Sequence, residues 1–137
     1  MPYVMFMVRQ PEGKYVNEWL LQFHPSAPQW KKVRLGALPD KELARMYEVA
    51  LRWADAIYIE DNTVFIVEAK LENQLAGVSQ LELYAKLFKE TPEFSAYASF
   101  PIQLRLIAPF REREVEAMCQ ERGIAYEVYT PAWFSRF

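Results

Sequence analysis

The stretch RWADAIYIEDNTVFIVEAK, residues 52–70, contains two apolar runs joined by a short polar segment. Both runs are rich in the β-branched and aromatic residues that favour strands. The dipeptide Asp61-Asn62 between them suits a two-residue hairpin loop. The stretch therefore predicts an antiparallel hairpin with strands over about 54–60 and 63–70.

Three charged residues lie within these apolar runs, namely Asp55 in the first and Glu68 and Lys70 in the second. If the loop has two residues, pairing along the hairpin places Asp55 directly opposite Glu68, with their Cβ atoms about 4.5–5.5 Å apart. Lys70 then points to the same side as Glu68. A loop of three or five residues would shift this register.

Two carboxylates at that distance repel each other, so a shared proton, a lysine or a divalent cation must offset the repulsion. Hard cations such as Mg²⁺ bind carboxylate oxygens and commonly bind substrate phosphate as well. A metal-bound water has a lowered pKa, and a neighbouring lysine can orient or deprotonate it. The pattern is consistent with phosphodiester hydrolysis, although a charged cluster on a half-exposed sheet would look the same.

Helices and strands alternate through the rest of the chain. We expect a strand at 2–8, a strand or short helix within 12–25, a loop at 25–29, a helix within 38–53, a helix at 79–90 with Ser79 as N-cap, a strand within 100–109, a helix within 111–123 and a last strand within 124–131. This order predicts an α/β fold with a mixed sheet, antiparallel in the hairpin and parallel across the helical crossover.

Asp55 followed by Glu68-Ala69-Lys70 at the end of the next strand resembles the motif of the PD-(D/E)XK nuclease superfamily. Ala54 stands where the family's proline is usually written. The resemblance covers roughly residues 40–130. It implies a restriction-endonuclease-like α-β-β-α-β-α-β core with a mixed central sheet flanked by helices. Residues 1–137 would form a single domain of this type, with 1–39 as an N-terminal addition.

The helix after the motif carries Gln80 and Tyr84, which share one helical face. They resemble the Gln-x-x-x-Tyr signature of the superfamily's recombination-exonuclease branch, in which these side chains flank the metal site and help to position the DNA strand. A core role for Tyr84 and a solvated Gln80 would give the same spacing.

The resemblance also implies roles for individual residues. Asp55 and Glu68 would bind Mg²⁺ or Mn²⁺ together with the Ala69 carbonyl. Lys70 would hold or deprotonate the attacking water. A helix glutamate often joins the metal site, and we favour Glu48 over Glu42 because it is nearer to the hairpin. The candidates for phosphate contacts are Lys31, Lys32, Arg34 and Arg52.

Composition restricts the alternatives. One cysteine and one histidine exclude an ordinary Cys/His zinc site within the chain. The net charge of −2 does not suit a protein that coats nucleic acid by charge alone. Without a signal peptide or a long apolar run, a cytoplasmic protein with no membrane association is expected.

The sequence thus predicts a divalent-metal-dependent nuclease that hydrolyses DNA phosphodiester bonds, either structure-selective or exonuclease-like, with a role in recombination or repair. DNA as the partner follows from the resemblance alone. A homodimer or higher homo-oligomer would suit a small nuclease that makes two nicks. The alternative is a catalytically inactive subunit on the same fold that binds nucleic acid or assists assembly.

Overall fold

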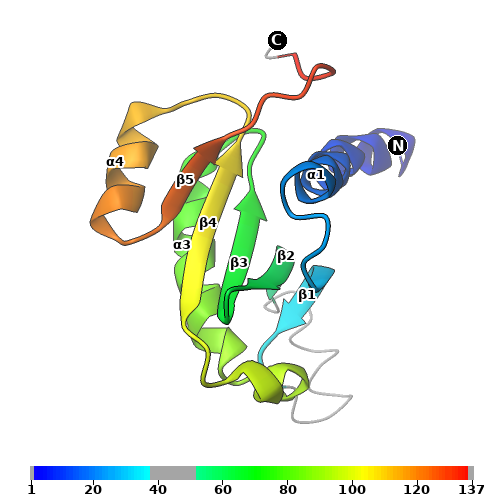
Figure 1. Cartoon of the computed structure of the whole chain (residues 1–137). Helices are drawn as coiled ribbons and strands as arrows, with labels where there is room; N and C mark the ends of the chain where they lie inside the picture. Colours follow the sequence, from blue (N-terminus) through cyan, green and yellow to red (C-terminus); the bar gives the residue numbers. More distant parts are fainter. Residues whose placement is uncertain (1, 38–51, 136–137) are drawn as a thin grey trace.

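The centre of the molecule is a five-stranded mixed sheet, in a computed structural model that describes residues 2–37 and 52–135 (Figure 1). Its elements, in chain order, are α1 Pro2–Phe23, β1 Gln29–Leu35, β2 Arg52–Glu60, β3 Thr63–Ala69, α3 Gln74–Phe88, the 3₁₀ helix η2 Pro92–Tyr97, β4 Ile102–Ala108, α4 Arg113–Glu121 and β5 Ala125–Val128.

The strands lie in the sheet in their chain order, from β1 at one edge to β5 at the other. The pairs β1–β2 and β2–β3 are antiparallel, whereas β3–β4 and β4–β5 are parallel. The parallel pairs are joined through α3 and α4, because a parallel connection must cross back along the sheet. The predicted α/β fold with a mixed sheet flanked by helices is confirmed.

The hairpin forms as the sequence predicts. Asp61 and Asn62 are its two loop residues, with φ values of 51° and 56°. Both lie in the left-handed region that a type I′ turn requires, and Asp and Asn tolerate this region better than most residues. The facing pairs run from Glu60–Thr63 to Ala56–Val67.

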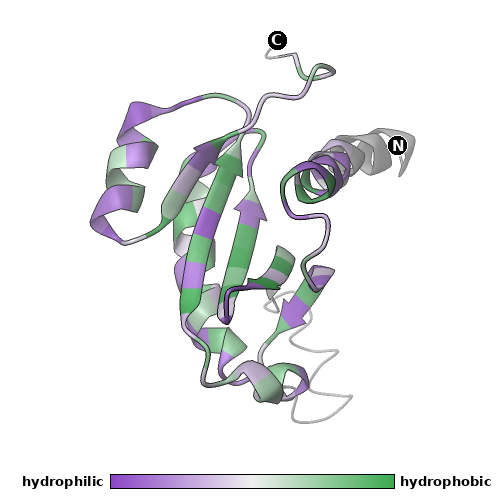
Figure 2. Ribbon diagram, viewed as in Figure 1, coloured by the Kyte–Doolittle hydropathy of each residue, from purple (hydrophilic) through white to green (hydrophobic). Residues whose placement is uncertain are grey.

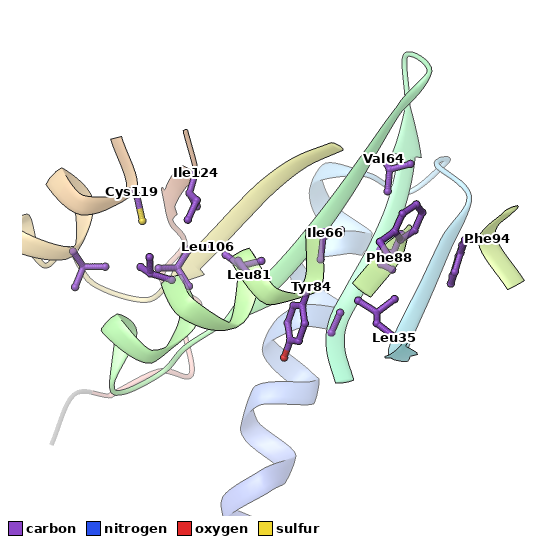
Figure 3. Close-up of a cluster of buried hydrophobic side chains, with 14 residues drawn as sticks. Leu35, Val64, Ile66, Leu81, Tyr84, Phe88, Phe94, Leu106, Cys119 and Ile124 are labelled. Atoms are coloured by element: carbon purple, nitrogen blue, oxygen red, sulfur yellow. The ribbon is translucent and has the colours of Figure 1, made fainter. Parts of the chain in front are cut away.

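Two hydrophobic clusters pack on opposite faces of the sheet. On one face, α3 and α4 contribute Leu81, Tyr84, Phe88, Val115 and Cys119 to the cluster drawn in Figure 3. On the other face, α1 packs against the sheet through Tyr15, Val16, Trp19 and Leu20. Burial of the sheet on both faces explains why the middle of β3 is green in the hydropathy colouring of Figure 2, whereas much of α4 is purple.

Three predictions about the elements are wrong. Residues 2–8 belong to helix α1 and form no strand, because a short apolar run does not by itself distinguish a strand from a helix. Helix α3 begins at Gln74, so Ser79 lies inside it, and its N-cap is Asn73. Strand β1, which begins at Gln29 inside the predicted loop, was not foreseen.

The described residues leave one predicted helix untested and contain no candidate membrane span. The predicted helix within 38–53 falls almost wholly on residues 38–51, which lie outside the described part. Within the described residues, no helix combines the length and the apolarity that crossing a bilayer demands.

Candidate active site

The site begins where strands β2 and β3 separate. In an antiparallel ladder every second facing pair exchanges backbone hydrogen bonds. If the ladder continued beyond Ala56–Val67, the backbone N–H of Ala69 would donate to the backbone of β2. That N–H instead donates to Oδ2 of Asp55 at 2.8 Å. The predicted register is therefore confirmed as far as Ala56, and the Asp55 carboxylate then lies in the opening between the strands.

Glu68 lies on β3 beside this opening and is only 4% exposed. Its Oε2 is 3.6 Å from Nζ of Lys70, the residue that directly follows β3. Its Oε1 is buried and accepts no hydrogen bond from any residue of the described part. The structure thus brings together Asp55, Glu68 and Lys70, and none of the described residues donates to one of the buried oxygens of Glu68.

The electrostatic state of Glu68 follows from this geometry. Burial raises its pKa from 4.5 to about 9, and the negative charge of Asp55 acts in the same direction. Lys70 lowers this pKa, but by less than burial raises it. Near neutral pH the Glu68 carboxyl therefore holds a proton, unless a cation takes its place.

Lys32 supplies a second positive charge from the edge strand β1. Its Nζ lies 3.2 Å from Oδ1 of Asp55, although its side chain is 62% exposed. Its backbone φ is 53°, a left-handed conformation that costs free energy in a lysine and that is often found at functional sites. Lys32 was predicted as a phosphate contact, and it lies at the site in this structure.

Glu12 on α1 is an acidic residue of the site that the sequence interpretation missed. Burial and the negative charge of Asp55 raise the pKa of Glu12, whereas Lys70 lowers it. The hydrophobic periodicity of this helix could have identified Glu12. It precedes Tyr15 and Val16 by three and four residues, so it shares their buried helical face. Because the start of the chain was predicted to be a strand, this helical periodicity was not recognised.

Helix α3 covers the other side of the site. A Cβ built on Gly77 would lie 2.6 Å from Leu106 Cδ1, 3.2 Å from Lys70 Cγ and 3.7 Å from Glu68 Cγ. The absence of a side chain at Gly77 therefore lets the helix approach the strand that carries the two charged residues.

Gln80 and Tyr84 differ in their surroundings. Tyr84 is 2% exposed, packs in the cluster of Figure 3, and its hydroxyl donates to the carbonyl of Trp53 at 3.0 Å. Gln80 is half-buried, and its Oε1 is buried without a donor from the described residues. The proposed steering of DNA by these two side chains stays a prediction.

The other predicted residues are placed as follows. Lys31 is exposed on β1, and the guanidinium of Arg34 lies 4.7 Å from the ring centroid of Trp53. Arg52 is the first residue of β2. The helix glutamates predicted for the metal site, Glu48 and Glu42, lie outside the described residues.

The donor set of the site suits a hard cation. Asp55 and Glu68 offer carboxylate oxygens, and the buried Oε1 of Glu68 needs a positive partner. Within residues 2–37 and 52–135, no three side chains of His, Cys, Asp or Glu converge into a complete metal site. A cation here would therefore combine the two carboxylates with backbone oxygen, water or substrate phosphate, which is the usual habit of Mg²⁺.

Known proteins resemble the chain in structure only. The sequence matches no protein-family model and no curated protein. A repair endonuclease from Pyrococcus abyssi superposes with a TM-score of 0.53 and 12% identity over 85% of this chain and 46% of its own. EndoMS, in a complex with dsDNA, superposes with a TM-score of 0.52 and 14% identity over 85% of this chain and 44% of its own.

This chain shares its fold with these two structures. It spans less than half the length of the two matched chains. At identities of 12% and 14% the likeness concerns the fold alone.

Proposed function

We propose that the chain is a divalent-metal-dependent nuclease that hydrolyses DNA phosphodiester bonds. The observation that carries this proposal is the buried Glu68 carboxyl group, which lies beside Asp55, is 3.6 Å from the Lys70 ammonium and has one oxygen to which no described residue donates. Such an arrangement is costly in a metal-free protein, and metal-dependent hydrolysis would give it a use.

Each residue would have a separate task. Mg²⁺ or Mn²⁺ would be held by Asp55, Glu68 and the Ala69 carbonyl, with Glu12 close enough to add negative charge. When bound, the ion would polarise the phosphate and lower the pKa of a bound water. Lys70 Nζ would donate a hydrogen bond to the attacking water or to a phosphoryl oxygen, and so stabilise charge in the transition state.

DNA as the substrate is supported by the fold, because one structural neighbour is a repair endonuclease and the other is EndoMS in a complex with dsDNA. Lys31, Lys32 and Arg34 on β1 would contact phosphates. Gln80 and Tyr84 would position the strand, as in the recombination-exonuclease branch. The whole-chain activity of the longer neighbours is not carried over to this shorter chain.

A second candidate is a catalytically inactive subunit that binds nucleic acid. The ion pair between Lys32 Nζ and Asp55 Oδ1 favours it, because a lysine already neutralises the carboxylate that a metal would use. This candidate predicts DNA binding without cleavage in any divalent metal.

The test is cleavage of end-labelled single-stranded, duplex, flap and four-way-junction DNA with Mg²⁺ or Mn²⁺. We expect the native protein to cut at least one of these substrates and Lys70→Met to cut none, while the thermal stability of the variant stays close to native. Arg113→Met is the matched control, because Arg113 is exposed on α4, at the edge of the sheet far from β1.

Cleavage by Lys70→Met at the native rate would overturn the assignment of the site. Binding of DNA by the native protein, without cleavage in either metal, would instead favour the inactive subunit.

A further inference from the structure

A cavity of about 150 Å³ lies between helix α1 and strand β1, next to the candidate active site. Its lining residues are Gly13, Val16, Asn17, Lys31, Lys32 and Asp55. The volume is about five times the roughly 30 Å³ that a water occupies in the liquid, and it is below the roughly 300 Å³ at which pockets for drug-sized ligands begin. The cavity therefore has room for a small polar group and none for a nucleoside.

The cavity has the charge of an anion site. Lys31 forms no ion pair or hydrogen bond with any residue of the described part, so its ammonium is free to bind a ligand. Lys32 and Asp55 both line the cavity, and Lys32 Nζ is paired with Asp55 Oδ1 at 3.2 Å. The exposed Asn17 adds an amide that can donate hydrogen bonds. Two ammonium groups against one carboxylate leave the lining with a net positive charge, which together with the amide suits a phosphate group.

Gly13 contributes the open part of the wall. It lies within α1, where a glycine costs about 1 kcal/mol relative to alanine. A Cβ built on Gly13 would meet no atom within 4 Å, so packing does not explain the glycine. Its missing side chain instead keeps the space between helix and strand clear.

We propose that this cavity binds the terminal phosphate of a DNA strand, beside the position at which the strand is cut. The proposal rests on the proposed nuclease function and deepens it by naming the substrate class. A phosphate inside a strand carries a sugar on both sides, which hinders its entry into a cavity of this size. A terminal phosphate carries one sugar only and is close to a dianion at neutral pH, so the net positive charge of the lining attracts it more strongly than the single charge of an internal phosphate.

The proposal is tested by equilibrium binding in EDTA, where hydrolysis does not occur. The probes are short oligonucleotides of one sequence with an internal fluorophore, carrying a 5′-phosphate, a 3′-phosphate or hydroxyls at both ends. We expect one phosphorylated end to bind about tenfold more tightly than the hydroxyl form, as one good charged hydrogen-bonding contact would give. Fluorescence anisotropy gives the three dissociation constants.

Two variants remove the subsite by different means. Lys31→Met removes a charge, and Gly13→Leu fills the space while improving the helix propensity of α1. Both should abolish the preference for the phosphorylated end without lowering the melting temperature, and the remote control Arg113→Met should keep it. Equal affinity of the native protein for all three probes would overturn the proposal. Equal weakening of all three by Lys31→Met would also overturn it, because that result assigns the lysine to internal phosphates.

The two proposals fail separately. A preference for a phosphorylated end in EDTA, without cleavage in Mg²⁺, would keep the subsite and reject the nuclease. Cleavage without any preference for a phosphorylated end would keep the nuclease and reject the subsite.

Discussion

Replacing Glu68 by glutamine should stabilise the metal-free protein above about pH 5, and the gain should grow as the pH rises. The pKa of Glu68 is 4.5 in the absence of the fold and about 9 in the folded protein. The folded state therefore holds a proton that the unfolded state releases. The stability that this carboxyl contributes is fully present below pH 4.5 and is lost progressively as the pH rises toward 9. A glutamine at this position does not titrate, so its contribution to stability does not change with pH.

The magnitude follows from the width of this pH window. One pH unit within it corresponds to about 1.4 kcal/mol, so between pH 5 and pH 7 the native protein loses at most about 2.7 kcal/mol through Glu68. For a chain of this size, 1 kcal/mol shifts the melting temperature by about 3–5 °C. The melting temperature of Glu68→Gln should therefore rise relative to the native protein by roughly 10 °C between these two pH values.

The assay is thermal unfolding followed by circular dichroism in EDTA at pH 5, 6, 7 and 8. Glu121→Gln is the matched control, because it makes the same substitution at a position that is exposed at the end of α4. The control should follow the native curve at every pH. Parallel curves for Glu68→Gln and the native protein, or a less stable Glu68→Gln at pH 8, would show that Glu68 does not hold a proton in the folded protein.

Four further variants test the packing and the charge of the site. Gly77→Ala should lower the free energy of unfolding, measured by urea denaturation, by about 1–3 kcal/mol, because its methyl would collide with Leu106. Gly13→Ala, whose methyl meets nothing within 4 Å, should instead stabilise the protein by about 0.5–1 kcal/mol. Tyr84→Phe should cost about 1 kcal/mol in the same assay through its lost hydroxyl hydrogen bond, and an unchanged stability would argue against that bond. Glu12→Gln should weaken Mn²⁺ binding about tenfold, measured by electron paramagnetic resonance, and an unchanged affinity would place Glu12 outside the metal's influence.

The hairpin was predictable because local chemistry determines it. Asp61 and Asn62 accept left-handed backbone, which fixes the loop at two residues, and the loop fixes the register of the strands. The proximity of Asp55 and Glu68 follows from that register. The separation of the strands at this point was not predictable, because it depends on a hydrogen bond from the N–H of Ala69 to a side chain.

The first part of the chain was harder to predict because its pattern is ambiguous. An apolar run of seven residues at 2–8 fits a strand as well as a helix, and only the longer period through Trp19 and Leu20 shows the helix. The placement of Glu12 beside Asp55 depends on how α1 packs across the sheet, which no local pattern encodes. Lys32 was predicted for a charge contact, but its left-handed backbone and its pairing with Asp55 are tertiary features.

The sequence predicts the charge state of the site only in part. The sequence predicts that Asp55 and Glu68 repel and need a positive partner. It does not predict that Glu68 is almost completely buried, which raises its pKa more than the neighbouring charge does. Burial of this kind depends on Gly77, whose missing side chain lets α3 approach the strand.

Calorimetric titration with Mn²⁺ measures directly whether Asp55 and Glu68 form a cation site. The titration is performed at pH 7.5 in two buffers of different ionisation enthalpy, which together give the number of protons released. Because the pKa of Glu68 is about 9, binding should release about one proton per Mn²⁺, and Asp55→Asn should abolish the binding. No binding by the native protein, or equal binding by Asp55→Asn, would contradict the account.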